Sequence, residues 1–149
     1  MQKINLSFKR FGLDIKLRVE KHNESNYIIP VPLPFPNGTS IRKLVLVDIK
    51  EFIDDINYLI PKSLEGNIEE IAFESLYQIM VKHIRTYGRI YRNDLDTYLA
   101  ENILLFNAIL KAKGKSSLNE KEQQERFIKF NKIAFGILPE NLKSEYLTS

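Results

Sequence analysis

The sequence predicts an α+β protein with an N-terminal antiparallel β-hairpin and sheet, a proline-rich edge strap and a C-terminal bundle of about four helices. Three observations support this class: alternating apolar residues in the first third, a run of alternating prolines, and helical periodicity from about Asp48 onward. We expect one domain over residues 1–149, β-rich in 1–47 and helical in 48–149, because the apolar faces of the sheet and the helices can close on each other.

Two short runs near the N-terminus alternate apolar and polar residues. Such period-two alternation is typical of strands that have one face on a core and the other in water. The short connection at residues 10–12 predicts that the two runs form an antiparallel hairpin. A further strand is expected over Ile41–Val47. The apolar positions of the hairpin are Ile4, Leu6 and Phe8, then Leu13, Ile15, Leu17 and Val19.

The segment Pro30-Val-Pro-Leu-Pro-Phe-Pro36 cannot be a central strand, because each proline lacks a backbone N–H donor. It is expected to be an edge strand or a polyproline-like strap that directs Val31, Leu33 and Phe35 to one side. Packing of the strap on its own sheet is the favoured interpretation. If the strap is exposed instead, these three residues become candidates for contact with another subunit.

Helical periodicity predicts four longer helices in the remainder of the chain. The first begins near Asp48 and is stopped by Pro61, and the second opens at Asn67 with Glu70 and is interrupted or ended by Gly88. The third is capped by Asn93, and its apolar middle, residues 103–106, predicts the buried centre of a bundle. The fourth is capped by Ser117 with Glu120, and a short terminal helix is expected from Pro139 through Leu147.

The composition speaks against the common kinds of active site. The chain has no cysteine, two histidines and six unclustered glycines, so it lacks thiolate chemistry, the usual nucleophilic machinery and a phosphate-binding glycine loop. We therefore predict no catalytic residue, no metal site and no cofactor. The absence of a signal peptide and of a long apolar run predicts a cytoplasmic protein, or a virion component if the chain is viral, without a membrane partner.

Charge is segmented along the chain. Residues 51–74 hold one basic and seven acidic side chains, whereas residues 75–93 hold four basic side chains and no acidic one. Within the basic block, Lys82, Arg85, Arg89 and Arg92 share one helix face if the helix continues through Gly88, with Tyr87 and Tyr91 between them. Cations interleaved with aromatics can hold phosphates and stack bases, which makes these six residues candidate nucleic-acid ligands.

The structural interpretation of the same basic block is that it faces solvent or pairs with acids of the first helix, as charged helix faces usually do. The acids available there are Glu51, Asp54 and Asp55, with Asp48 one turn earlier. They lie opposite the apolar stripe, where any amphipathic helix carries its charges, so a metal site is not favoured. Pairing within the chain would make the basic block structural.

The tripeptides Asp14-Ile-Lys16 and Asp48-Ile-Lys50 resemble one fragment of the motif of metal-dependent, restriction-type nucleases. The motif also requires a second acid upstream on a neighbouring strand. None precedes Asp14, although Asp14 itself could serve for Asp48. Two tripeptides arise easily by chance. A nuclease is therefore the third-ranked hypothesis.

The function that these observations favour is a non-catalytic subunit of a larger assembly, such as a virion or a nucleoprotein complex. Segmented charge, the rigid proline strap and the missing catalytic machinery motivate this hypothesis. The expected partners are other protein subunits or a second copy of the chain. The alternative is a nucleic-acid-binding module that uses the basic block.

Overall fold

The computed structural model describes residues 3–23, 26–34 and 40–143, and for residues 30–34 and 40–44 it describes the backbone alone. The described elements are four strands followed by four α-helices and one short 3₁₀ turn, which confirms the α+β class. The strands are β1 (Lys3–Arg10), β2 (Leu13–Lys21), β3 (Asn26–Pro34) and β4 (Ser40–Asp48). The helices are α1 (Ile49–Leu59), η1 (Lys62–Leu64), α2 (Ile68–Tyr87), α3 (Arg92–Ala112) and α4 (Glu120–Ile137).

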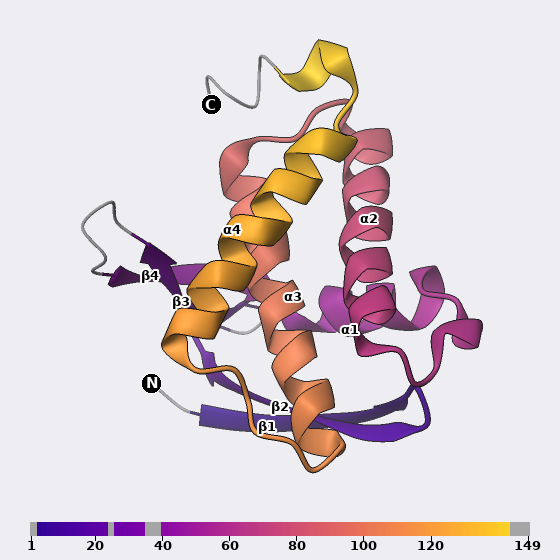
Figure 1. The fold of residues 1–149 in the computed structure, drawn as a ribbon, viewed down its shortest axis with the longest axis vertical. Coiled ribbons are helices and arrows are strands. Elements are labelled where there is room, and N and C mark those ends of the chain that lie inside the picture. Colours follow the sequence, from indigo (N-terminus) through magenta and orange to yellow (C-terminus); the bar gives the residue numbers. More distant parts are fainter. Residues whose placement is uncertain (1–2, 24–25, 35–39, 144–149) are drawn as a thin grey trace.

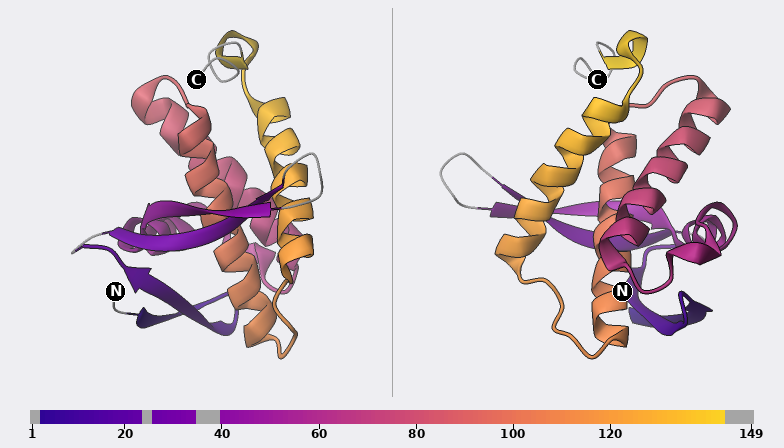
Figure 2. Two further views of the ribbon diagram at one scale, coloured as in Figure 1. Left: turned by 90° about the vertical axis from the view of Figure 1, so that its left-hand side faces the viewer. Right: turned by 45° about the vertical axis from the view of Figure 1, so that its right-hand side comes forward.

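The four strands form one antiparallel sheet in the order β1-β2-β3-β4. The predicted N-terminal hairpin is confirmed, with Leu6 opposite Leu17 and a two-residue turn at Phe11 and Gly12, both of which have positive φ. Only two residue pairs, Glu20↔Ile28 and Lys21↔Tyr27, join β2 to β3. As a result, the β1–β2 and β3–β4 hairpins diverge from a short shared segment (Figure 2).

The proline segment is an edge strand along most of its length. Its register with β4 runs unbroken from Asn26↔Asp48 to Pro34↔Ser40, whereas its pairing with β2 ends at Ile28. Pro30, Pro32 and Pro34 are alternate residues, so their missing donors share one edge, which must face away from β4. Val31 and Leu33 pair with Lys43 and Ile41. Phe35 lies outside the described residues, so the proposed contacts of these three residues stay a prediction.

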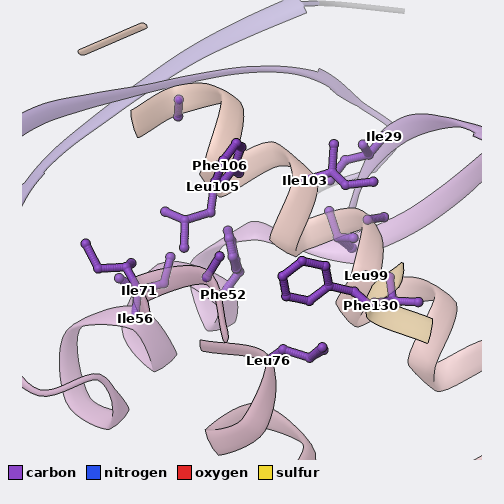
Figure 3. Close-up of a cluster of buried hydrophobic side chains, with 14 of the residues drawn as sticks. Ile29, Phe52, Ile56, Ile71, Leu76, Leu99, Ile103, Leu105, Phe106 and Phe130 are labelled. Atoms are coloured by element: carbon purple, nitrogen blue, oxygen red, sulfur yellow. The ribbon is translucent and has the colours of Figure 1, made fainter. Parts of the chain in front are cut away.

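Helices α2, α3 and α4 stand on one face of the sheet (Figure 1). Helix α3 is the central element, because it contacts β2, β3, β4, α2 and α4. This confirms the prediction from its apolar middle: Ile103, Leu105 and Phe106 are buried. Apolar side chains from the strands and all four helices form a single cluster (Figure 3).

Two predicted helix starts are wrong. The third helix begins at Arg92, because the Asp94 carboxylate accepts the Tyr91 N–H and caps the helix two residues before Asn93. The fourth helix is capped by Asn119 rather than Ser117, through a reciprocal pair of hydrogen bonds with Glu122. Residues 140–143 are helical, as expected after Pro139, and the remainder of that predicted helix lies outside the described residues.

Candidate functional site

The basic block does not form one continuous helix face. Helix α2 ends at Tyr87, because Gly88 takes a left-handed conformation and its N–H bonds back to the Ile84 carbonyl. Lys82 and Arg85 therefore lie on α2, Arg89 lies in the connection, and Arg92 is the first residue of α3. The expectation of a shared face through Gly88 is not met, although all four cations remain at the corner where α2 meets α3.

Lys82 is part of the protein's own structure. Its ammonium lies 2.6 Å from a carboxylate oxygen of Asp55 and 3.5 Å from one of Glu51, both on α1. The hydrogen bond to Asp55 raises the pKa of Lys82, so this side chain keeps its proton while it joins the two helices. The structural interpretation, pairing with acids of the first helix, therefore holds for Lys82. We remove Lys82 from the candidate nucleic-acid ligands.

A cleft of about 420 Å³ opens between α1, the C-terminal half of α2 and the first turns of α3. Its lining combines carboxylates, cations and aromatic rings, and the volume lies in the range of small-molecule sites. The contributing side chains include Glu51 and Asp55 of α1, Lys82, His83 and Tyr87 of α2, Arg89 and Tyr91 of the connection, and Asp94 and Tyr98 of α3.

His83 is held on both ring nitrogens at the wall of this cleft. Nδ1 lies 2.5 Å from the Tyr98 hydroxyl oxygen, and Nε2 lies 3.4 Å from an Asp94 carboxylate oxygen. The carboxylate favours the proton on Nε2, so Nδ1 accepts from the Tyr98 hydroxyl. Burial lowers the pKa of His83 despite the neighbouring Asp94, so the ring is neutral at pH 7.

The cleft does not contain an activated nucleophile. Burial, and secondarily the charge of Glu101, raises the pKa of the Tyr98 phenol, so its hydroxyl keeps its proton. Burial also raises the pKa of Glu101 well above its usual range, helped by Asp55 and Glu51. The protonated Tyr98 hydroxyl can donate a hydrogen bond at the cleft wall, but in this form it is a weak nucleophile.

Asp94, Tyr98 and Glu101 were not predicted as site residues. Their spacing of four and three residues places them on one face of α3. Asp94 and Tyr98 line the cleft and contact His83, and Glu101 is buried one turn further along the helix. The spacing of these three residues could be read from the sequence. Their partners on α1 and α2 could not be predicted, because those contacts depend on how the helices pack.

The residues that we call the Arg–Tyr corner are Arg85, Tyr87, Arg89 and Tyr91. Tyr87, Arg89 and Tyr91 line the cleft, and Arg85 lies two residues before Tyr87 on α2. All four are exposed, and 66% of Tyr87 is accessible to solvent. The Arg89 guanidinium lies 4.9 Å from the centroid of the Tyr91 ring, and the Tyr87 ring lies 4.6 Å from that of His83. Arg92 already has an interaction within the chain, so it is not included.

The acids of the nuclease hypothesis are far apart. Asp14 and Lys16 are exposed on β2 close to the hairpin turn, whereas Asp48 pairs with Asn26 and caps α1. Lys21, at the Asp48 end of β2, lies seven residues or roughly 23 Å from Asp14. Within residues 3–23, 26–34 and 40–143, no group of three or more His, Asp and Glu side chains could hold a metal ion.

Comparisons with models of known protein families, with curated proteins and with solved structures give no match to this chain. The function of the site must therefore be argued from its own geometry and chemistry. Among the described helices, none has both the length and the apolar character that crossing a bilayer demands.

Proposed function

We propose that the protein binds single-stranded nucleic acid through the Arg–Tyr corner. The observation that carries the proposal is that Arg85 and Arg89 do not pair with the acids of α1. Those acids, Glu51 and Asp55, contact Lys82 instead. Both arginines are exposed, and the Arg89 guanidinium lies 4.9 Å from the centroid of the exposed Tyr91 ring.

The chemistry of the corner suits a flexible strand. Guanidinium groups bind phosphate oxygens through paired N–H donors, and an exposed ring stacks on any unpaired base. A duplex would offer the phosphates but would keep its base faces stacked away from Tyr87 and Tyr91. Single-stranded DNA or RNA is therefore favoured over duplex.

The cleft behind the corner is less suited to phosphate. Glu51, Asp55 and Asp94 bring three carboxylates to its lining, against the two cations Lys82 and Arg89. A phosphate would be repelled from this interior and is expected to stay at the outer edge. The strand should therefore cross the corner rather than enter the cleft.

The test is fluorescence anisotropy of a labelled single-stranded oligonucleotide at low and moderate salt. The double variant R85E/R89E is compared with K16E/R18E, which changes the net charge equally at exposed positions of β2. We expect R85E/R89E to weaken binding at least tenfold and to lower the slope of log affinity against log salt by about 1.4, the value for two lost contacts with a single strand. Equal loss in both variants would show a diffuse charge effect, and no loss in R85E/R89E would refute the assignment.

A second comparison tests stacking. Tyr87→Ala should weaken binding by about 1 kcal/mol or more, as is usual when an aromatic ring that stacks on a base is removed. Tyr87→Phe keeps the ring and should bind like the parent. If both variants bind like the parent, Tyr87 does not contact a base.

The second candidate function is a subunit of a larger assembly. It is favoured by a separate surface, on the outer side of α2 and α4, whose apolar groove and exposed rings suit contact with another protein chain. Neither candidate requires a reaction or a cofactor.

A further inference from the structure

An apolar groove of about 370 Å³ lies between α2 and α4, away from the Arg–Tyr corner. Its apolar lining is formed by Leu64, Phe73, Phe130 and Ile133. Phe73 is 40% exposed and stacks on Tyr77, itself 38% exposed, with ring centroids 6.4 Å apart. Two large exposed rings next to an apolar groove are the usual composition of a protein-binding surface.

The two edges of the groove carry opposite charge. Glu69, Glu70 and Glu74 lie on the α2 edge, and Lys129 lies on the α4 edge, with Lys132 exposed nearby on the same helix. Arg126 of α4 forms an ion pair with Glu69 of α2 and neutralises its charge. Within the described part of the chain, neither Glu70 nor Lys129 forms an ion pair, so the α2 edge stays acidic and the α4 edge basic.

We propose that this groove binds a second copy of the chain in a two-fold symmetric dimer. A two-fold axis along the groove places α2 of one copy against α4 of the other, so that each acidic edge meets a basic edge. A partner of a single charge sign would be attracted by one edge and repelled by the other. The surface is complementary to itself, and this selects a second copy over an unrelated acidic or basic partner.

The proposed dimer surface is separate from the Arg–Tyr corner. Phe73 and Tyr87 are fourteen residues apart on α2, which is about 21 Å along a helix. The dimer would leave both corners accessible and would give a nucleic-acid strand two binding points. The inference does not depend on the proposed function, because each surface can be disrupted without the other.

The experiment is size-exclusion chromatography with light scattering over a range of concentrations. We compare the parent with E70K/E74K, with K129E/K132E, and with the variant that carries all four substitutions. Each double variant should weaken dimerisation at least tenfold, and the fourfold variant should restore it, because both edges then change sign together. R85E/R89E is the matched control and should dimerise like the parent. Circular dichroism establishes that each variant is folded.

Three results would overturn the proposal. They are a parent that stays monomeric at the highest concentration, double variants that dimerise as well as the parent, or a fourfold variant that remains monomeric while folded. If dimerisation fails while the oligonucleotide still binds, the dimer surface is refuted and the nucleic-acid proposal stands.

Discussion

The Lys82 ammonium donates a hydrogen bond of 2.6 Å to the Asp55 carboxylate and so joins α2 to α1 in the lining of the cleft. Asp55 is the more buried partner, and its side chain is 13% exposed. Asp55→Asn should therefore reduce the free energy of unfolding by about 1 kcal/mol, the usual size of a partly exposed charge-assisted contact. Urea denaturation measures the change, and the exposed neighbour Asp54→Asn serves as the control. Equal stability of D55N and the parent would contradict this role.

The same pair should show a defined pH dependence. The folded-state pKa of Lys82 is raised above 10.5, so its contribution to stability is fully present below pH 10.5 and is lost as pH rises through the folded value. Because Asp55 also raises the pKa of Glu101, the comparison is made with Glu101→Gln in both proteins. In that background the difference between the protein that keeps Asp55 and the one that carries D55N should be constant from pH 6 to pH 9. A difference that changes within that range would point to another titrating group.

His83 should make the fold less stable in mild acid. Its folded-state pKa is lowered below 6.5 by burial, so the unfolded chain binds the proton first as pH falls. Stability is expected to decline once pH drops below 6.5 and to level off below the folded value. Urea midpoints at pH 8 and pH 5 measure the decline, and His83→Gln should reduce it. His22→Gln, at the exposed histidine of the β2–β3 connection, should leave it unchanged.

Glu101 should destabilise the protein at neutral pH. Its folded-state pKa is raised well above 4.5, chiefly by burial, so the unfolded chain ionises first as pH rises above 4.5. Glu101→Gln removes this cost and should increase the free energy of unfolding at pH 7 by about 1 kcal/mol or more, with little effect near pH 4. Denaturation at both pH values checks this, with exposed Glu125→Gln as the control. A loss of stability at pH 7 would mean that the Glu101 carboxylate has a structural role.

Arg126 should be poorly replaced by lysine. Its guanidinium makes three hydrogen bonds to the Glu69 carboxylate and lies 3.6 Å from the centroid of the Phe106 ring. An ammonium group can neither form the paired contact nor stack flat on the ring, so Arg126→Lys should cost about 1–3 kcal/mol of stability. Arg18→Lys, on the exposed face of β2, should cost almost nothing. Thermal or urea unfolding distinguishes the two variants.

The helices and strands could be predicted from the sequence wherever only one local pattern applied to a segment. Ile15, Leu17 and Val19 alternate strictly, and they face the core as expected. Ser117 and Asn119 each have a glutamate three residues later, so local pattern alone could not choose between them. A tertiary contact determines where the helix begins. The Leu118 N–H donates a hydrogen bond to the Asn107 side chain of α3, which keeps this part of the chain outside the helix.

The candidate site could be predicted only in part. Arg85, Tyr87, Arg89 and Tyr91 could be singled out as candidates because they are close in sequence with no acid between them, and their role in binding stays a proposal. Pairing of Lys82 with an acid of the first helix was one of the interpretations of the basic block. The cleft itself was missed, because the His83–Tyr98 contact joins residues 15 positions apart on different helices. The periodicity of one sequence predicts which face of a helix is buried. It does not predict which other helix or strand that face packs against.

The prolines of β3 affect how readily copies of the protein can aggregate at high concentration. A cross-β fibril grows when each new strand finds alternating donors and acceptors along an open edge. On β3 that edge lacks its donors at Pro30, Pro32 and Pro34, so an arriving strand would leave its carbonyl groups unpaired. The exposed edge of β3 is in this way a poor template for polymerisation, and a strand that arrives there is opposed at the level of the backbone, whereas β1 and β4 form the outer edges of the sheet.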